Sequence, residues 1–331
     1  MPISRLLLRL VIVVAIGIAA YLLYRTLSQY SLDEIIESVR AIPAAHLARA
    51  FGFAAASYLC LSFFDWLAVR YAGKPLAWHR TALTSFTALS IGHNVGVAAL
   101  SSGAIRYRFY ARWGLGVGDV AKVILFCGIT VGLGLATMGG LALLLYPSTA
   151  EGLMGVNGPE LKGMAVVCLS LPLAWIVLSA FVRGELSVRK WSLTLPPLPL
   201  AIGQVVAGTA NYACVAACLH QLLAATSEVN YLEVAAIYVI GILASLISHV
   251  PGGLGVLEAT VLYLQPGAEA VGALLVFRLV YFLVPLALGL PTLLASEYVL
   301  RSPEKRKQDK RKTAKDAGVP AGATTAADGR S

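Results

Sequence analysis

The sequence predicts an all-α polytopic membrane protein, with six spanning helices and two broken, re-entrant helical hairpins in an inverted repeat. Of the 331 residues, 58% are hydrophobic and 13% are charged, whereas a soluble domain carries about 25% charged residues. Apolar runs of about 18 residues or more, the length of a membrane span, recur along the chain. Two of these runs contain glycine and histidine, and one also contains proline, so each would leave backbone amides unpaired in lipid.

The uninterrupted apolar runs predict six spanning helices, at 6–27, 48–71, 119–146, 163–182, 198–221 and 270–298. The first is longer than the core of a signal peptide, so we expect it to be retained. Residues 31–42 predict a short additional helix, because Ser31 and Glu34 form a capping box and apolar residues recur on one face. We expect this amphipathic helix to lie in the membrane interface.

Two further apolar stretches are interrupted: 81–112 around Gly92–Gly103, and 231–265 at Pro251–Gly255. If all eight stretches crossed the membrane, two groups of basic residues would lie outside, against the positive-inside rule. These residues are Arg106, Arg108, Arg112, Arg183, Arg189 and Lys190. If the interrupted stretches are re-entrant, both groups fall inside. We therefore favour six spans with two re-entrant hairpins, and keep eight spanning helices as the alternative.

The chain divides into a membrane domain at 1–300 and a basic tail at 301–331 that is expected to be disordered and cytoplasmic. Within the membrane domain, halves at about 1–146 and 163–300 form a weak repeat at a constant offset of 156 residues. The matched pairs are Ile91–Ile247, His93–His249, Gly96–Gly252, Tyr107–Tyr263, Lys122–Arg278 and Phe126–Phe282. Inverted repeats with discontinuous helices are typical of transporters. Both termini are predicted to be cytoplasmic.

The second break is the strongest candidate for a binding site. It contains Pro251, Gly252, Gly253 and Gly255, and a helix restarts near the last of them. Its free amides and positive dipole end suit an anion such as a lipid phosphate. Glu258 lies in the first turn, where it could receive a cationic headgroup. The alternative is a structural kink that Glu258 caps locally.

Arginines supply the next candidates. Arg278 lies about two turns into the last long helix, where a charge needs a partner or a polar cavity, and Glu258 is the nearest candidate partner. A purely structural ion pair is the alternative. Arg106, Tyr107 and Arg108 follow the first break and would suit a phosphodiester headgroup. Ordinary interfacial anchoring would explain them as well.

The remaining polar residues of the apolar segments have weaker predicted roles. We expect His93, Asn94 and His249 to cap freed carbonyls, with proton coupling as the alternative. Lys122 can snorkel to the interface, and Tyr281 is a further candidate because it lies close to Arg278. Single polar residues are expected to make interhelical hydrogen bonds: Asp65, Gln204, Asn211 and His220. A small-residue stripe predicts close helix packing: Gly132, Ala136 and Gly140.

Motifs of soluble enzymes are missing from the sequence. It has no Walker A lysine motif, no His-Glu-x-x-His and no nucleophile elbow. No metal and no cofactor are therefore expected. Nucleic-acid binding is not expected either, because the basic tail lacks aromatic residues and a folded module. The expected partners are the membrane and a phospholipid substrate.

The segment Asn94–Leu115 (NVGVAALSSGAIRYRFYARWGL) resembles the flippase region of the bacterial multiple peptide resistance factor, a lysylphosphatidylglycerol flippase/synthase. The segments His249–Glu258 and Phe277–Pro285 are similar to the same family, and the resemblance extends over about residues 5–300. It implies a multi-pass inner-membrane protein that moves aminoacylated phosphatidylglycerol to the outer leaflet and weakens attack by cationic antimicrobial peptides. By the same resemblance Arg106, Arg108, Glu258 and Arg278 occupy motif positions.

The bifunctional members of that family continue into further helices and a soluble aminoacyl-transferase domain, whereas this sequence ends in its basic tail. We therefore expect a lipid translocase rather than an enzyme. Its lipid would come from a separate aminoacyl-lipid synthase, or would be another anionic phospholipid. A homo-oligomer is compatible with this expectation. The alternatives are a membrane-embedded lipid-modifying transferase and a scaffold for a separate lipid synthase.

Overall fold

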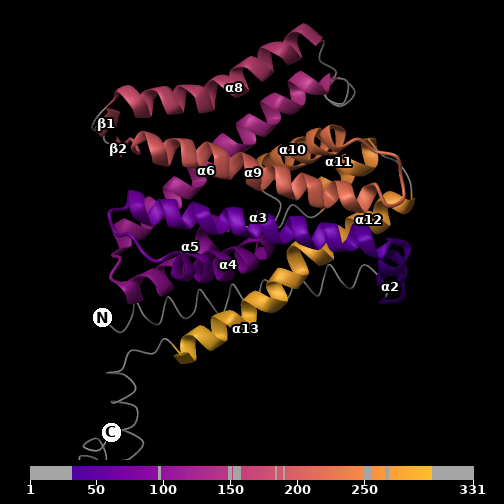
Figure 1. Ribbon diagram of the computed structural model, residues 1–331, viewed down its shortest axis with the longest axis horizontal. Coiled ribbons are helices and arrows are strands. Elements are labelled where there is room, and N and C mark those ends of the chain that lie inside the picture. Colours follow the sequence, from indigo (N-terminus) through magenta and orange to yellow (C-terminus); the bar gives the residue numbers. More distant parts are fainter. Residues whose placement is uncertain are drawn as a thin grey trace, which may run out of the picture. The chain divides into compact units, whose positions relative to one another are not determined.

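The computed structural model describes residues 32–95, 98–147, 151, 158–182, 185–188, 191–248, 255–264 and 268–299 (Figure 1). The chain divides into two units, Met1–Gly289 and Leu290–Ser331. Of the second unit, the structure describes the last part of one helix. The described residues are helical apart from one two-stranded hairpin, which confirms the predicted helical membrane fold at this level.

Among the described residues, five helices are long and apolar enough to cross a membrane. They are α3 (Ala44–Tyr71), α6 (Val117–Leu145), α8 (Gly158–Phe181), α9 (Leu198–Leu223) and a segment of 27 residues, Ala270–Ser296. The last of these comprises α12 (Ala268–Arg278), a π turn η3 (Leu279–Leu283) and α13 (Val284–Val299). These helices match five of the six predicted spans. The sixth, predicted at 6–27, lies outside the described residues.

Two smaller elements connect the long helices. The amphipathic helix α2 (Leu32–Ala41) lies where the capping box predicted it, and its Ser38 packs against Gly272 of α12, where an added Cβ would lie 3.3 Å from the serine Oγ. Strands β1 (Glu185–Val188) and β2 (Trp191–Thr194) form an antiparallel hairpin between α8 and α9. The sequence analysis did not predict these strands, because each has only four residues.

Each interrupted stretch forms a pair of helices that pack against each other. The first pair is α4 (Trp78–Val95) with α5 (Ala98–Tyr110), which continues into a 3₁₀ turn η1 (Ala111–Trp113); the second is α10 (Tyr231–Ser248) with α11 (Val256–Leu264). In Figure 1 the members of each pair lie side by side. With 13 and 9 residues, α5 and α11 are roughly 20 and 14 Å long. Neither reaches the ~30 Å of a hydrocarbon core, so neither stretch is one continuous rod.

Helices α3 and α9 form the centre of the first unit and run antiparallel. At one end His46 Nδ1 lies 3.0 Å from the carbonyl oxygen of Gln221. In the middle Ser57 Oγ donates to Asn211 Oδ1 at 2.7 Å. At the other end the Tyr71 hydroxyl donates to the carbonyl just before α9, that of Thr194, at 2.6 Å. The predicted offset of 156 residues superposes α3 on α9 in sequence, and antiparallel packing is the relation that an inverted repeat requires.

The order of elements recurs in the same way in both halves. A long helix, a packed helical pair and a second long helix occur as α3, α4–α5, α6 and again as α9, α10–α11, α12–α13. Close approach of α6 and α9 occurs at Gly134 and Gly208, where a Cβ added to Gly134 would lie 2.3 Å from the Gly208 backbone. The predicted small-residue stripe is therefore only partly right. Gly140 packs tightly on α8, whereas a Cβ added to Gly132 would meet no atom of a described neighbouring element within 4 Å.

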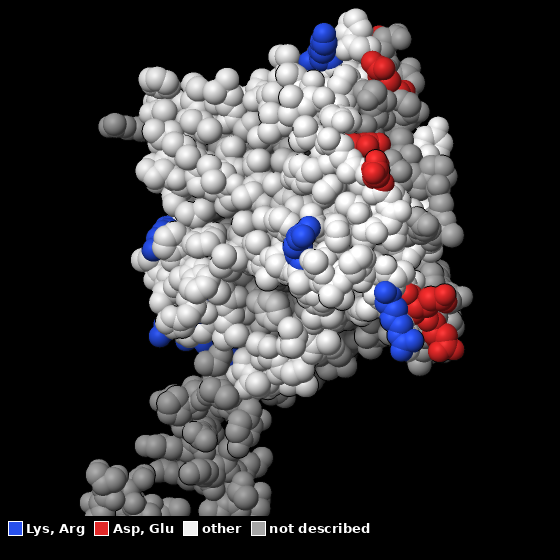
Figure 2. Space-filling model, turned by 45° about the vertical axis from the view of Figure 1, so that its right-hand side comes forward, with Lys and Arg blue, Asp and Glu red and all other residues white. Residues whose placement is uncertain are grey.

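Charged side chains concentrate toward the ends of the helices. Figure 2 shows a broad, mostly uncharged face, with acidic side chains along one edge next to a few basic ones. The end where α3 stops and α4 starts carries exposed basic residues: Arg70, Lys74 and Arg80. We call it the basic end. The opposite end, where α8 starts and α9 stops, carries Glu160 and Glu228. We call it the acidic end. An uncharged middle between two charged ends is expected of a protein surrounded by lipid.

Candidate functional site

The site is built around the start of α11, directly after the second break. Gly255 has a φ of +81°, a conformation that only glycine adopts without strain. Its backbone N–H donates to Glu258 Oε2 at 2.9 Å. Glu258 therefore caps the start of α11, which is the role that the alternative prediction gave it. The flanking residues Pro251, Gly252 and Gly253, together with His249, lie outside the described residues.

Glu258 also pairs with Arg278, the partner that the sequence predicted. Arg278 Nε lies 2.5 Å from Glu258 Oε1, and Nη2 lies 3.0 Å from Oε2. The Arg278 side chain is 7% exposed and that of Glu258 is 20% exposed. Two parallel charge-assisted bonds fix this geometry. The carboxylate is therefore held by its own helix and by α12, and one side of it remains accessible.

Directly after Arg278 the helix widens into the π turn η3 (Leu279–Leu283). The sequence explains this position, because Pro285 cannot donate to the carbonyl of Tyr281 and its ring would clash with that group in an α-helix. The hydroxyl of Tyr58 donates to the Tyr281 carbonyl at 3.4 Å, and Asn94 Nδ2 donates to the Phe282 carbonyl at 3.3 Å. Asn94 therefore hydrogen-bonds backbone carbonyls, that of Phe282 and, at 2.8 Å, that of Ser90 in its own helix. Turns of this kind occur frequently at functional sites.

Aromatic rings connect the first helical pair to Arg278. The His93 ring at the end of α4 stacks with that of Tyr281, with 6.3 Å between centroids, and lies 6.5 Å from that of Phe282. Arg278 Cζ lies 4.8 Å from the centroid of the same Phe282 ring. His93 Nδ1 is buried, and no described residue bonds it. The end of α4 and the start of α11 therefore both lie close to η3 and Arg278, and His93 Nδ1 caps no carbonyl of the described residues.

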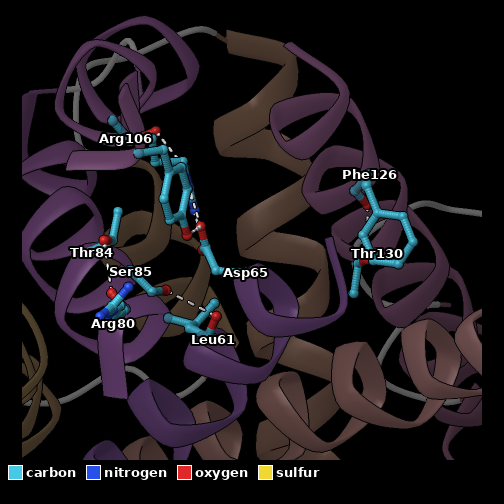
Figure 3. A network of polar contacts seen from close by, with 10 residues as sticks. Leu61, Asp65, Arg80, Thr84, Ser85, Arg106, Phe126 and Thr130 are labelled. Carbon is cyan, nitrogen blue, oxygen red and sulfur yellow. Dashed lines mark hydrogen bonds and ion pairs between the residues drawn. The ribbon is translucent and has the colours of Figure 1, made fainter. Parts of the chain in front are cut away.

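A second buried ion pair lies between α3 and α5 (Figure 3). Arg106 Nε and Nη2 donate to the two Asp65 carboxylate oxygens at 2.9 and 2.8 Å, and Nη1 donates to Ser102 Oγ at 3.0 Å. The Tyr110 hydroxyl donates to Asp65 Oδ1 at 2.7 Å. Side-chain exposure is 5% for Arg106 and 0% for Asp65. The predicted interhelical role of Asp65 is confirmed, and in this conformation all three Arg106 nitrogens contact protein rather than the membrane interface.

The other predicted residues lie in different surroundings. Tyr107 and Arg108 are half-buried on α5, and Lys122 is exposed near the start of α6. Gln204 and Asn211 bond neighbouring helices as predicted, whereas His220 Nε2 lies 3.2 Å from a loop carbonyl, that of Val229. In the part of the chain that the structure describes, no three His, Cys, Asp or Glu side chains could hold a metal ion.

The sequence analysis missed Tyr58 and Phe282, which connect η3 to α3 and α4. A signal was available, because a proline seven residues after a buried arginine, Pro285 after Arg278, disturbs the intervening turn. The ring contacts themselves depend on residues far apart in the chain. The described core therefore contains two buried arginine–carboxylate pairs, and the Glu258–Arg278 pair lies beside the π turn and its aromatic rings.

Comparisons with known proteins agree with a membrane protein of this architecture. The model of the family described as the lysylphosphatidylglycerol synthase TM region matches residues 12–289. The uncharacterized protein slr0712 of Synechocystis sp. is 27% identical over 286 residues, which cover 85% of this chain and 89% of that protein. The inner membrane protein YbhN of Escherichia coli is 26% identical over 265 residues, covering 78% of this chain and 82% of that protein. The similarity therefore extends well beyond the motifs at the two breaks.

Proposed function

Because this chain belongs to the lysylphosphatidylglycerol synthase transmembrane-region family, we propose that it is a lipid translocase of the bacterial inner membrane. It is a multi-pass membrane protein of a lipid-related family, and the proposed substrate is an aminoacylated or other anionic phospholipid. Moving an aminoacylated lipid to the outer leaflet makes that surface less negative. Cationic antimicrobial peptides would then bind the cell less strongly.

The observation that carries this proposal is the Glu258–Arg278 pair beside a broken helix and a π turn. A headgroup with a phosphate and an ammonium group can separate this pair without leaving either charge alone. The phosphate takes the place of Glu258 on Arg278, and the ammonium group pairs with Glu258. Each buried charge keeps a partner throughout, which avoids the several kcal/mol that an unpaired buried ion costs. A lipid with a phosphate alone would leave Glu258 unpaired, so the pair favours an aminoacylated headgroup.

The arrangement of the helical pairs suggests the path. The α4–α5 pair begins at the basic end and the α10–α11 pair at the acidic end, and both break near η3. We expect each pair to re-enter the membrane from its own side, as in transporters with inverted repeats. Such halves exchange conformations during transport. The pair Asp65–Arg106, enclosed here, would open in the other state, which would give Arg106 its predicted contact with the headgroup.

The test uses purified protein in liposomes that contain a headgroup-labelled aminoacyl phosphatidylglycerol, with a membrane-impermeant reductant reporting which leaflet the label occupies. Glu258→Gln and Arg278→Gln are each expected to slow translocation roughly 10- to 100-fold, because each removes a charge-assisted bond to the headgroup. Glu160→Gln, an exposed carboxylate at the start of α8, is the matched control and should behave as wild type. Wild-type rates in both pair variants would rule out this site.

A further inference from the structure

One face of α3 changes from apolar to charged along its length. Leu59 is 46% exposed and Phe63 is 38% exposed; Trp66 and then Arg70 follow at helical spacing on the same face. The Arg70 guanidinium carbon lies 3.3 Å from the centroid of the Trp66 ring, and its Nη1 donates to the Trp66 carbonyl at 3.3 Å. The arginine is thus held in place while its outer edge stays exposed.

The start of α4 adds a tryptophan that contacts α3 and a second arginine at the same end of the helices. Trp78 is 42% exposed, its Nε1 donates to Ser62 Oγ at 3.1 Å, and its ring lies 6.1 Å from that of Phe63. Arg80, two residues further along α4, is exposed and lies 5.7 Å from the Trp113 ring centroid. We call the residues Leu59, Phe63, Trp66, Arg70, Trp78, Arg80 and Trp113 the α3–α4 stripe.

The dimensions of the stripe fit one leaflet of a bilayer. From Leu59 to Arg70 the helix advances about 17 Å, close to the ~15 Å that is half of a hydrocarbon core. Tryptophan prefers the headgroup level of the membrane, and three of the chain's five tryptophans lie in the stripe. A phospholipid lying along α3 would place its acyl chains on Leu59 and Phe63 and its phosphate beside Arg70, with Arg80 at the same end of the helices.

We propose that the α3–α4 stripe is a binding site for an anionic phospholipid of the leaflet at the basic end. The Arg70 guanidinium suits a phosphate, because the Trp66 ring holds it in place, its outer N–H groups stay available and little side-chain freedom is lost. The stripe is also connected to the buried Asp65–Arg106 pair through one residue, Tyr110. The Trp113 ring lies 6.2 Å from the Tyr110 ring, and the Tyr110 hydroxyl donates to Asp65. Lipid binding by the stripe does not depend on transport. Only a role of the stripe in receiving the transported substrate rests on the proposed function.

The test measures quenching of tryptophan fluorescence by phosphatidylglycerol with brominated acyl chains, against brominated phosphatidylcholine, in mixed micelles. Wild type is expected to prefer phosphatidylglycerol, and each stripe arginine should contribute about fivefold to that preference. Arg70→Gln with Arg80→Gln should therefore remove it. Arg40→Gln with Arg49→Gln is the matched control, because both arginines are exposed on α2 and the start of α3 at the other end.

Two further measurements test whether the acyl chains contribute to binding and whether a water-soluble phosphate can bind in place of the lipid. Phe63→Ala should weaken quenching by both lipids, and water-soluble glycerophosphate at the same concentration should not displace the brominated lipid. Circular dichroism checks that every variant keeps its helices. The proposal is overturned by equal quenching from the two lipids in wild type, by an unchanged preference in the double variant, or by displacement with glycerophosphate. None of these readouts requires transport, so they stand even if translocation is not observed.

Discussion

Neutralising both members of the Glu258–Arg278 pair separates a structural role from a binding role. In Glu258→Gln the amide oxygen can still cap Gly255, but the Arg278 guanidinium, only 7% exposed, loses its carboxylate. Leaving one partner of a buried pair alone costs about 3–5 kcal/mol. The lower end, about 3 kcal/mol, is expected here, because Glu258 is 20% exposed and the Phe282 ring stays beside the cation.

The double variant Glu258→Gln with Arg278→Gln has no uncompensated charge. Its free energy of unfolding should therefore recover to within about 1 kcal/mol of wild type, about 2 kcal/mol above that of Glu258→Gln. At roughly 2–4 °C per kcal/mol for chains of this order of size, Glu258→Gln should lower the apparent Tm by about 6–12 °C. The double variant should lower it by only a few degrees. Thermal shift in detergent at one fixed scan rate measures wild type and both variants.

Translocation in liposomes then decides between the two roles. If the pair binds the headgroup, the double variant recovers its stability and still does not transport, because neither charge is present to receive the phosphate or the ammonium. If the pair only holds α11 against α12, transport recovers together with the Tm. That second result would refute the proposed binding role. A double variant as unstable as Glu258→Gln would instead refute the assumption that the two charges compensate each other.

Three further predictions concern the bundle. Asp65→Asn should lower the free energy of unfolding by about 3–5 kcal/mol, more than Glu258→Gln, because the Asp65 side chain is 0% exposed whereas that of Glu258 is 20% exposed; equal Tm shifts for the two would contradict this. Gly208→Ala should lower the apparent Tm by several degrees, because its Cβ would lie 2.5 Å from a backbone carbonyl of α6. Gly132→Ala is the control and should leave the apparent Tm unchanged. Similar Tm values for the two variants would exclude the backbone contact at Gly208. Asn94→Ala should cost about 1–3 kcal/mol by leaving a carbonyl of η3 without its donor, and an unchanged Tm would show that another group satisfies it.

Hydropathy and turn chemistry predicted the long helices well. The predicted starts and ends agree with the observed ones within a few residues. A helix that leaves the hydrocarbon is followed by charged residues, glycine or proline, and these are visible in the sequence. The Glu258–Arg278 pair was predictable for a similar reason. A carboxylate three residues after a helix-starting glycine, followed by an arginine at membrane depth 20 residues later, leaves few other partners within reach.

Contacts between distant segments could not be predicted in the same way. Nothing near Arg106 indicates that its carboxylate partner is 41 residues earlier in the chain, or that Ser102 and Tyr110 complete the network. The π turn was indicated by Pro285, but its second donor is Asn94, 188 residues away from Phe282. The position of these groups follows from how α3, α4 and η3 pack, and packing depends on the shapes of many side chains at once.

The two ion pairs differ in which element carries the arginine and in how deeply the carboxylate is buried. In the first half the arginine lies on the helical pair and its carboxylate on a long helix; in the second half the carboxylate lies on the helical pair and the arginine on a long helix. Asp65 is fully buried and also accepts a bond from Tyr110, whereas Glu258 is partly exposed. A partly exposed ion pair needs less free energy to separate than a fully enclosed one. If the protein translocates lipid as proposed, we therefore expect the second half to open first and the first half to stay closed until the headgroup has bound.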